Sequence, residues 1–352
     1  MEIKDLDKNF ANNNILKKGN FVNVPSDKVN LYGVIYDKER GFIRFPHEIA
    51  STVSEGVLYL SEHTAGGRIA FKTNSTKIKI IVTYDALEKM YHMPLTGQAG
   101  FTLLEVKNGK EFHRFTYTVD FGAQTGYEST SKKLPGRGMR NYVLYFPLYN
   151  KVKTLTLEID KKADIEAFNP YKDVLPILYY GSSITQGGCA SRPDNSYQSM
   201  ITKQNRIDHI NLGFSGNARG EKTMAEYLAN TKCSIFVMDY DHNAPSVEHL
   251  EQTHETMFKT FRAKQPSTPV IFLSAPNFYV DKKTYIPRRN IIKRTYENAV
   301  HNGDKNVYFI DGSTIYPKAW RESCAVDDAH PNDLGFSMFA KKLLPLINKI
   351  LK

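Results

Sequence analysis

The sequence predicts an antiparallel β-sandwich followed by an α/β domain built on a parallel sheet. Two observations lead to this prediction. Short alternating segments separated by turn residues fill the first half, whereas apolar strands alternate with helix-length stretches in the second. The length of 352 residues also suits about two domains. A polar stretch containing a proline, residues 161–173, separates the two patterns, and we place the domains at residues 1–168 and 169–352.

In the first half, apolar and polar residues alternate over short segments, with no helical period between them. Residues 100–120 contain Asn108-Gly109 between two alternating runs, which is a strong signal for a hairpin. Strands at this spacing are typical of an antiparallel sandwich. The segments predicted as strands or strand pairs cover residues 67–73, 77–84, 100–120, 140–148 and 153–160.

The second half changes period. Apolar strand candidates cover residues 174–181, 209–214, 234–241, 270–276 and 307–312. Helix-length stretches cover residues 220–230, 246–263, 284–300 and 333–352. Strand and helix in alternation imply right-handed crossovers, and therefore a parallel sheet with helices on both faces. Such sheets bind ligands at the carboxyl ends of their strands, so the residues at those ends are the first candidates for chemistry.

The charge distribution argues against a nucleic-acid partner. Lys and Arg exceed Asp and Glu by 47 to 37, a net charge of +10. The excess is even, with 24 basic against 19 acidic residues in 1–170 and 23 against 18 in 171–352. Nucleic-acid-binding modules usually concentrate their charge in one patch or stripe, and no such block is visible. We therefore expect a mixed, solvated surface.

The cysteine pattern and the N-terminus bear on the compartment. Cys189, Cys233 and Cys324 are widely spaced without a C-x-x-C pair, which favours a reducing compartment, although one bridge plus a free thiol stays open. The N-terminus is polar, and no apolar run approaches the roughly 18 residues that a spanning helix needs. We expect no membrane partner and a cytoplasmic protein as the sequence stands, or a periplasmic or secreted one if a signal has been removed. The oligomeric state is not predicted.

A candidate nucleophile, Ser183, follows the first strand of the second half in the segment Gly181-Ser182-Ser183-Ile184-Thr185. A serine on such a turn presents its hydroxyl at the top of the sheet, beside N–H groups of the next helix. A base candidate, His330, follows Asp327 by three residues, a spacing that lets the carboxylate hold the imidazole and fix its tautomer. Ser183, His330 and Asp327 are therefore a candidate triad. The alternative is a solvated acidic loop with an incidental histidine.

Candidate oxyanion donors follow the next two strands. The segment 211–217 offers glycine N–H groups that a substrate can approach closely, and Asn243 offers a side-chain amide at the end of the third strand. We expect the N–H groups of Ser183 and Gly216 and the Asn243 side chain to converge on one developing oxyanion. Each such donor is typically worth about 10²–10³ in turnover.

Metal and cofactor motifs are absent from the sequence. There is no H-E-x-x-H, no phosphate-binding G-x-x-x-x-G-K-[ST] and no G-x-G-x-x-G after the first strand, so we expect neither a metal nor a cofactor. Four residues near the catalytic segments are candidate pocket residues: Gln186, Asn217, Arg219 and Trp320. Trp320, the only tryptophan, suits a sugar platform or equally a core position, and Arg219 suits a pocket or a solvated helix start.

Together, these segments resemble the four blocks of the SGNH (GDSL-type) hydrolase superfamily, in the same order. In this resemblance Ser183 matches the nucleophile, Gly216 the oxyanion glycine, Asn243 the block-three asparagine, and Asp327 with His330 the acid–histidine pair. The resemblance covers residues 171–352 and implies a three-layer, flavodoxin-like domain with a five-stranded parallel sheet.

Two positions depart from the family pattern. The family's aspartate before the nucleophile is Ser182 here, and the aspartate after the block-three asparagine is Ala244. Neither change removes a catalytic group, but both alter local hydrogen bonding.

An N-terminal, jelly-roll-like sandwich ahead of such a domain is similar to two-domain bacterial carbohydrate esterases. The resemblance implies a serine esterase that hydrolyses short-chain acyl esters, most simply acetyl, on an oligosaccharide or small molecule. The alternatives are a lipid or thioester acyl hydrolase of the same superfamily, and a non-catalytic carbohydrate-binding protein in which the sandwich binds the ligand.

Overall fold

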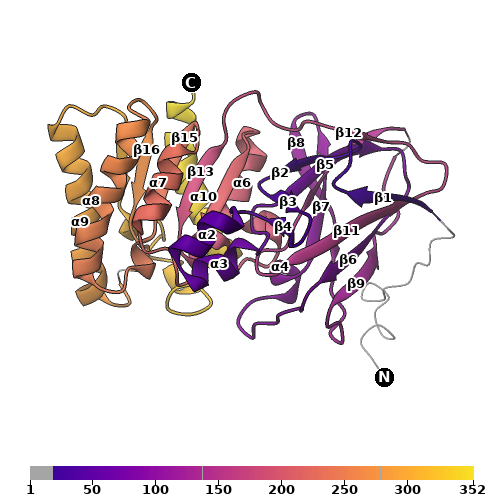
Figure 1. Cartoon of the computed structure of the whole chain (residues 1–352), viewed down its shortest axis with the longest axis horizontal. Helices are drawn as coiled ribbons and strands as arrows, with labels where there is room; N and C mark the ends of the chain where they lie inside the picture. Colours follow the sequence, from indigo (N-terminus) through magenta and orange to yellow (C-terminus); the bar gives the residue numbers. More distant parts are fainter. Residues whose placement is uncertain (1–18, 137, 278) are drawn as a thin grey trace.

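The structure is a computed structural model that describes residues 19–136, 138–277 and 279–352. Figure 1 shows a part made of antiparallel sheets beside a part in which helices flank a parallel sheet. Both predicted fold classes are confirmed. The N-terminal segment 1–18, on which the expectation of no signal peptide rests, lies outside the described residues. Among the described residues, no helix is long and apolar enough to cross a membrane.

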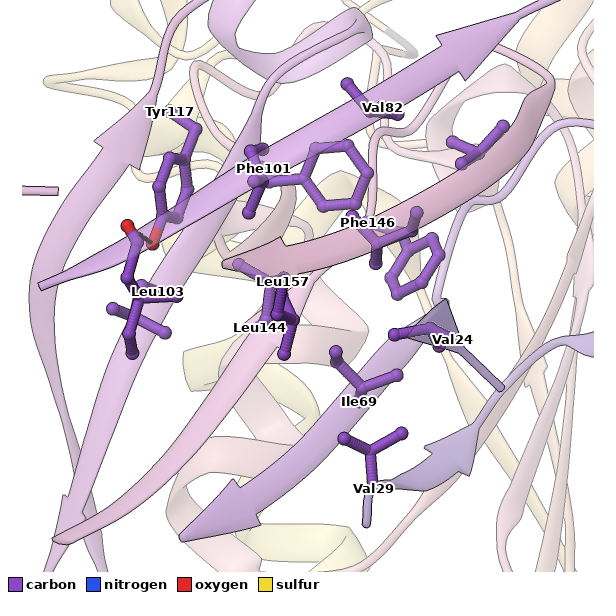
Figure 2. Close-up of a cluster of buried hydrophobic side chains, with 14 of the residues drawn as sticks. Val24, Val29, Ile69, Val82, Phe101, Leu103, Tyr117, Leu144, Phe146 and Leu157 are labelled. Atoms are coloured by element: carbon purple, nitrogen blue, oxygen red, sulfur yellow. Dashed lines mark hydrogen bonds between the residues drawn. The ribbon is translucent and has the colours of Figure 1, made fainter. Parts of the chain in front are cut away.

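The first part is a sandwich of two antiparallel sheets. One sheet has the order β1-β11-β6-β9, formed by β1 (Asn20–Val24), β11 (Val152–Ile159), β6 (Ile78–Tyr84) and β9 (Gly126–Thr130). The other has the order β12-β5-β10-β7-β8, with β2 also on β5, formed by β12 (Ile165–Ala167), β5 (Arg68–Thr73), β10 (Arg140–Tyr145), β7 (Phe101–Lys107), β8 (Lys110–Tyr117) and β2 (Asn30–Tyr32). Alternate residues of both sheets face each other, and Figure 2 shows Val82, Phe101, Leu144 and Leu157 in this core.

The predicted Asn108-Gly109 hairpin is present and joins β7 to β8. Asn108 has φ 52° and Gly109 has φ 72°. Two successive residues with positive φ match the twist of the flanking strands, and asparagine and glycine tolerate that conformation best. Lys107 consequently pairs with Lys110 across the turn.

The first half also contains helices that the strand prediction missed. After the hairpin of β3 (Ile35–Asp37) and β4 (Gly41–Ile43) come α2 (His47–Val53) and α3 (Glu55–Ser61), and α4 (Leu95–Gln98) precedes β7. Ser54 begins α3 by accepting the N–H of Val57 at 3.1 Å. Apolar side chains of this segment, Phe45 and Val57 among them, join the core of the second part beside Phe214. The helices therefore belong by packing to the other part of the molecule, which is why a sandwich pattern did not reveal them.

The second part contains a five-stranded parallel sheet of order β14-β13-β15-β16-β17. Its strands are β13 (Ile177–Gly181), β14 (His209–Gly213), β15 (Ile235–Asp239), β16 (Val270–Leu273) and β17 (Val307–Ile310). This is the flavodoxin-like order: the second strand of the sheet, β14, lies on one side of β13, and the later strands are added on the other side. The predicted boundary at 168/169 falls between β12 and β13 and stays a prediction.

Helices cover both faces of this sheet. One face packs on α7 (Lys222–Asn230), α8 (Val247–Lys264) and α9 (Lys282–His301), and the other on α6 (Tyr197–Asn205) and α10 (Asp333–Ile350). The predicted helices correspond to α7, α8, α9 and α10, whereas α6 was not predicted. Shorter elements are α5 (Ser183–Gln186), η2 (Pro193–Asn195), η3 (Asp241–Asn243), η4 (Gly312–Thr314) and η5 (Arg321–Ser323).

A buried polar contact joins the two parts. Arg68 of β5 is fully buried, and its guanidinium contacts the carboxylate of Asp208 and the ring of His209 at the start of β14. The His209 ring is also 2.7 Å from the Thr202 hydroxyl of α6. Since a buried cation needs partners, this contact holds β5 of the sandwich against β14.

Candidate active site

Ser183 lies at the carboxyl end of the central strand β13. Gly181 ends the strand, and a Cβ there would lie 2.1 Å from the Asp239 carbonyl oxygen, so only glycine fits. Ser182 then begins α5 by accepting the Ile184 N–H at 3.2 Å. Ser183 is the first residue of this short helix and is 9% exposed. The position matches the strand-to-loop turn expected from the sequence.

The loop before α10 brings His330 and Asp327 to Ser183. His330 Nε2 lies 2.9 Å from Ser183 Oγ, and His330 Nδ1 lies 2.8 Å from Asp327 Oδ2. The other carboxylate oxygen accepts the backbone N–H groups of Ala329 at 2.8 Å and His330 at 2.7 Å. The structure thus brings the three candidate triad residues into one continuous chain of hydrogen bonds.

The Asp327 carboxylate is kept ionised. Burial alone would raise the pKa of Asp327, but the backbone N–H and imidazole of His330 and the N–H of Ala329 outweigh it and hold the pKa below its usual value. An ionised acceptor places the imidazole proton on Nδ1. Nε2 of His330 is then left with a lone pair toward the Ser183 hydroxyl, which is the arrangement a general base requires.

Gly216 lies on the loop after β14, and Asn243 lies on the loop after β15. Asn243 ends η3, and its Nδ2 donates to the Phe214 carbonyl at 2.8 Å. The Phe214 N–H donates to the Gly181 carbonyl at 2.8 Å, which fixes the start of this loop beside the end of β13. Gly216 has φ +69°, and a Cβ there would meet no described atom within 4 Å. Its surroundings are therefore open enough for a substrate to approach the backbone.

The four candidate pocket residues have different surroundings. Gln186 is fully buried: its amide accepts the Ser215 N–H at 3.1 Å and lies 3.1 Å from His63 Nδ1, so it supports the glycine loop from beneath. Asn217 is half-buried and donates to the Ser215 carbonyl at 2.8 Å. Arg219 is exposed and donates to the Gly216 carbonyl at 3.2 Å. Trp320 is 59% exposed, so it is not a core residue.

Residues of the first half reach the site, and sequence reasoning missed them. The Tyr149 hydroxyl donates to the Ser183 carbonyl at 3.1 Å. His63, after α3, contacts Gln186 of the nucleophile helix, and His92 lies beside His330 with ring centroids 5.7 Å apart. All three lie on loops of the other half of the chain. The spacing of residues along the sequence does not predict which loop of one half will contact the other half.

Two further groups beside the site are held in their neutral forms. Burial lowers the pKa of His242 to about 3, and the charges of His330 and Arg288 add to this shift. Burial raises the pKa of the Cys189 thiol to about 12, with Asp327 adding to it. A thiol with this pKa is a poor nucleophile, so Cys189 fits an inert buried cysteine. Among the described residues, no group of three or more His, Cys, Asp or Glu side chains is arranged to hold a metal ion.

His63 makes the stability of the fold depend on pH. Burial lowers the pKa of its imidazole from 6.5 to about 3, and Arg44 and Lys151 contribute further. Between these values the unfolded chain binds a proton that the folded chain does not, so stability falls as the pH falls below 6.5. Relative to His63→Gln, we expect the native protein to lose about 1 kcal/mol between pH 7.5 and pH 5.5.

Urea unfolding of the two proteins at each pH measures this difference. Between pH 7.5 and pH 8.5 the difference should stay constant, because His63 is then neutral in both states. A stability difference that is equally constant down to pH 5.5 would contradict a buried, neutral imidazole.

Known protein families match both halves of the chain. The family model of GDSL-like lipases/acylhydrolases matches residues 175–348, and the model of the N-terminus of SGNH-hydrolase-type esterases matches residues 19–165. The chain belongs to the SGNH (GDSL-type) hydrolases. As a member of this family it is a carboxylic ester hydrolase. No curated protein sequence matches it.

Solved structures share the two-part architecture of this SGNH hydrolase. A protein from Bacteroides ovatus described as a GDSL-like lipase is 29% identical, with 94% of this chain and 98% of that chain covered and a TM-score of 0.85. A salicylyl-acyltransferase from a tetracycline biosynthetic pathway is 18% identical, with 96% and 98% covered and a TM-score of 0.77. An acetyl xylan esterase from the rumen bacterium Butyrivibrio proteoclasticus is 13% identical, with 94% and 99% covered and a TM-score of 0.59. The last two likenesses concern the fold.

The structure also accounts for the two departures from the SGNH pattern. Ser182, at the position of the family's aspartate, supplies the side-chain oxygen that begins α5. Ala244, at the other position, is buried next to η3 and belongs to the core on the α7–α9 face of the sheet. Neither residue interrupts the hydrogen bonds between Ser183, His330 and Asp327.

Proposed function

We propose that this SGNH hydrolase is a serine esterase that removes short acyl groups, most simply acetyl, from carbohydrates. The observation that carries the proposal is the hydrogen-bonded chain from Asp327 through His330 to Ser183, with distances of 2.8 Å and 2.9 Å. A hydroxyl is a weak nucleophile until a neighbouring base accepts its proton, and this chain supplies that base with its orienting carboxylate.

The proposed reaction has two halves. Ser183 Oγ attacks the ester carbonyl while His330 Nε2 accepts its proton, and the tetrahedral oxyanion receives hydrogen bonds from the N–H groups of Ser183 and Gly216 and from the Asn243 amide. The intermediate collapses as His330 returns the proton to the departing alcohol. Water then attacks the acyl-enzyme with His330 again as base, which releases the acid and restores the serine. Water is the only co-reactant, so atoms and charge balance.

The choice of carbohydrate esters rests on the shared two-part fold and on two exposed side chains. Proteins of the same two-part fold include one named an acetyl xylan esterase, although at 13% identity that likeness concerns the fold. The exposed Trp320 and Arg219 offer an aromatic face and a charged donor, both of which suit hydroxyl-rich substrates. Acetylated sugars are therefore the first substrates to test.

Hydrolysis of p-nitrophenyl esters from acetate to laurate tests the proposal. We expect kcat/KM to be highest for acetate and to fall at least about tenfold by octanoate, because an acyl pocket that fits an acetyl group excludes a longer chain sterically. A preference for long chains would identify a lipid acyl hydrolase instead. If no p-nitrophenyl ester and no acetylated xylan releases acid, the proposal fails and a carbohydrate-binding role is favoured.

A further inference from the structure

A loop of the sandwich lies against the proposed catalytic histidine. This loop, residues 85–94, joins β6 to α4, and we call it the His92 loop. The rings of His92 and His330 have centroids 5.7 Å apart and planes inclined by 50°. The ring of Tyr91 follows at 5.1 Å from that of His92. Two side chains of the N-terminal half thus extend outward from His330 in a row.

Buried amide side chains hold the His92 loop in place. Gln98 accepts the Met90 N–H at 2.7 Å and donates to the Met93 carbonyl at 2.9 Å. Asn150 accepts the Glu88 N–H at 2.9 Å. Met93 is buried in the same core as Ile184 of the nucleophile helix. The loop is therefore pre-organised against the α/β part, although it belongs to the sandwich in sequence.

Among the described residues, ring contacts are the interactions that the side chains of Tyr91 and His92 make. Tyr91 is fully exposed, and its ring contact with His92 is the interaction that the structure gives it. The Nδ1 atom of His92 is buried and has no hydrogen-bond partner among the described residues. An unpaired buried nitrogen costs free energy, so folding alone does not favour this placement of His92.

The proposed chemistry says which part of a substrate meets this loop. His330 Nε2 delivers its proton to the departing oxygen, so the alcohol portion of the ester must lie beside the His330 ring. His92 and Tyr91 continue from that ring. An aromatic face packs well on the C–H face of a pyranose, while a ring nitrogen bonds a hydroxyl.

We propose that the His92 loop forms the subsite for the sugar alcohol, with Tyr91 as a stacking platform and His92 as a hydrogen-bonding partner of a sugar hydroxyl. This inference rests on the proposed esterase function and names the part of the substrate that the sandwich binds. It makes Tyr91 and His92 specificity residues that act on the alcohol and not on the acyl group.

Two acetate esters with different alcohols test the subsite. Methyl 2-O-acetyl-β-D-xylopyranoside presents a sugar that keeps free hydroxyls, and 2,2,2-trifluoroethyl acetate presents a small alcohol too short to reach Tyr91. For Tyr91→Ala, we expect the ratio of kcat/KM values (sugar ester over trifluoroethyl ester) to fall about fivefold to tenfold, mainly through KM. Tyr91→Phe should restore most of the ratio, because it keeps the ring. Phe21→Ala, which removes an exposed ring on β1 of the sandwich, is the matched control and should leave the ratio unchanged.

The outcomes separate the subsite from the esterase function. If Tyr91→Ala and His92→Ala leave the ratio unchanged, or lower both activities equally, the subsite is excluded while the esterase stands. If the native protein hydrolyses neither ester, the proposed function fails first. A ratio that falls for Tyr91→Ala and returns with Tyr91→Phe supports the subsite, because a general structural defect would change both esters alike.

Discussion

Replacing Ser183 by alanine is expected to lower kcat for ester hydrolysis by about 10⁴-fold or more. Among the described residues, the Ser183 hydroxyl is the group that lies 2.9 Å from His330 Nε2, and alanine offers no substitute for it in forming the proposed acyl-enzyme. Residual activity would come from direct attack of water on the ester, with the oxyanion donors still stabilising the tetrahedral intermediate. The fold should be retained, since the substitution removes one small hydroxyl and the lost hydrogen bond is worth about 1 kcal/mol.

A control variant at a second serine distinguishes the loss of the nucleophile from the loss of any hydrogen-bonded hydroxyl. Ser337 on α10 donates its hydroxyl to the Leu334 carbonyl at 2.7 Å, so Ser337→Ala removes a comparable hydrogen bond on the outside of the domain. Steady-state kinetics with p-nitrophenyl acetate, with thermal unfolding alongside, should show full activity for Ser337→Ala. If Ser183→Ala retains more than a few per cent of the native kcat, the serine mechanism is wrong.

Asn243→Ala is expected to lower kcat by about 10²–10³ with only a small change in KM. One N–H of the Asn243 amide donates to the Phe214 carbonyl at 2.8 Å, which aims the other N–H without reorganisation during the reaction. A donor that acts on the tetrahedral oxyanion stabilises the transition state more than the bound ester. The effect should therefore appear in kcat.

Asn230 provides the comparison for this variant. Its side chain donates to the Glu226 carbonyl at the same 2.8 Å, on the exposed end of α7. Asn230→Ala should keep the native kcat and change the melting temperature by little. If Asn243→Ala instead raises KM and leaves kcat intact, Asn243 binds the substrate ground state and is not part of an oxyanion hole.

Local patterns in the sequence predict those features that depend on neighbouring residues. Asn108-Gly109 predicts its hairpin because both residues tolerate positive φ. Gly181-Ser182-Ser183 predicts a tight turn after β13, where only glycine fits at position 181. Asp327 and His330 meet within one turn of chain, so their contact follows from their spacing. The joining of Ser183 with His330, 147 residues apart, could be predicted only through the family resemblance, because His330 lies on the loop before α10, well beyond the end of β17.

The remaining features depend on contacts between the halves of the chain. His63, His92 and Tyr149 come from loops of the sandwich half, where neither periodicity nor motif distinguishes them. Gln186, in the α/β half, likewise has surroundings that depend on contacts between the two halves. Its place after the nucleophile predicts a pocket residue, but the arrival of His63 and of the Ser215 N–H buries its amide completely.

The packing of α2 and α3 on the α/β part affects how the protein can be divided. Phe45, Val57 and Leu60 precede most of the sandwich in the chain, yet they complete a core that contains Phe214 and Met224. A fragment that starts after the sandwich would therefore expose apolar surface that the intact chain covers. We therefore expect the catalytic half to need residues 44–61 in order to fold stably, so a transfer of residues 169–352 alone onto another binding module should fail.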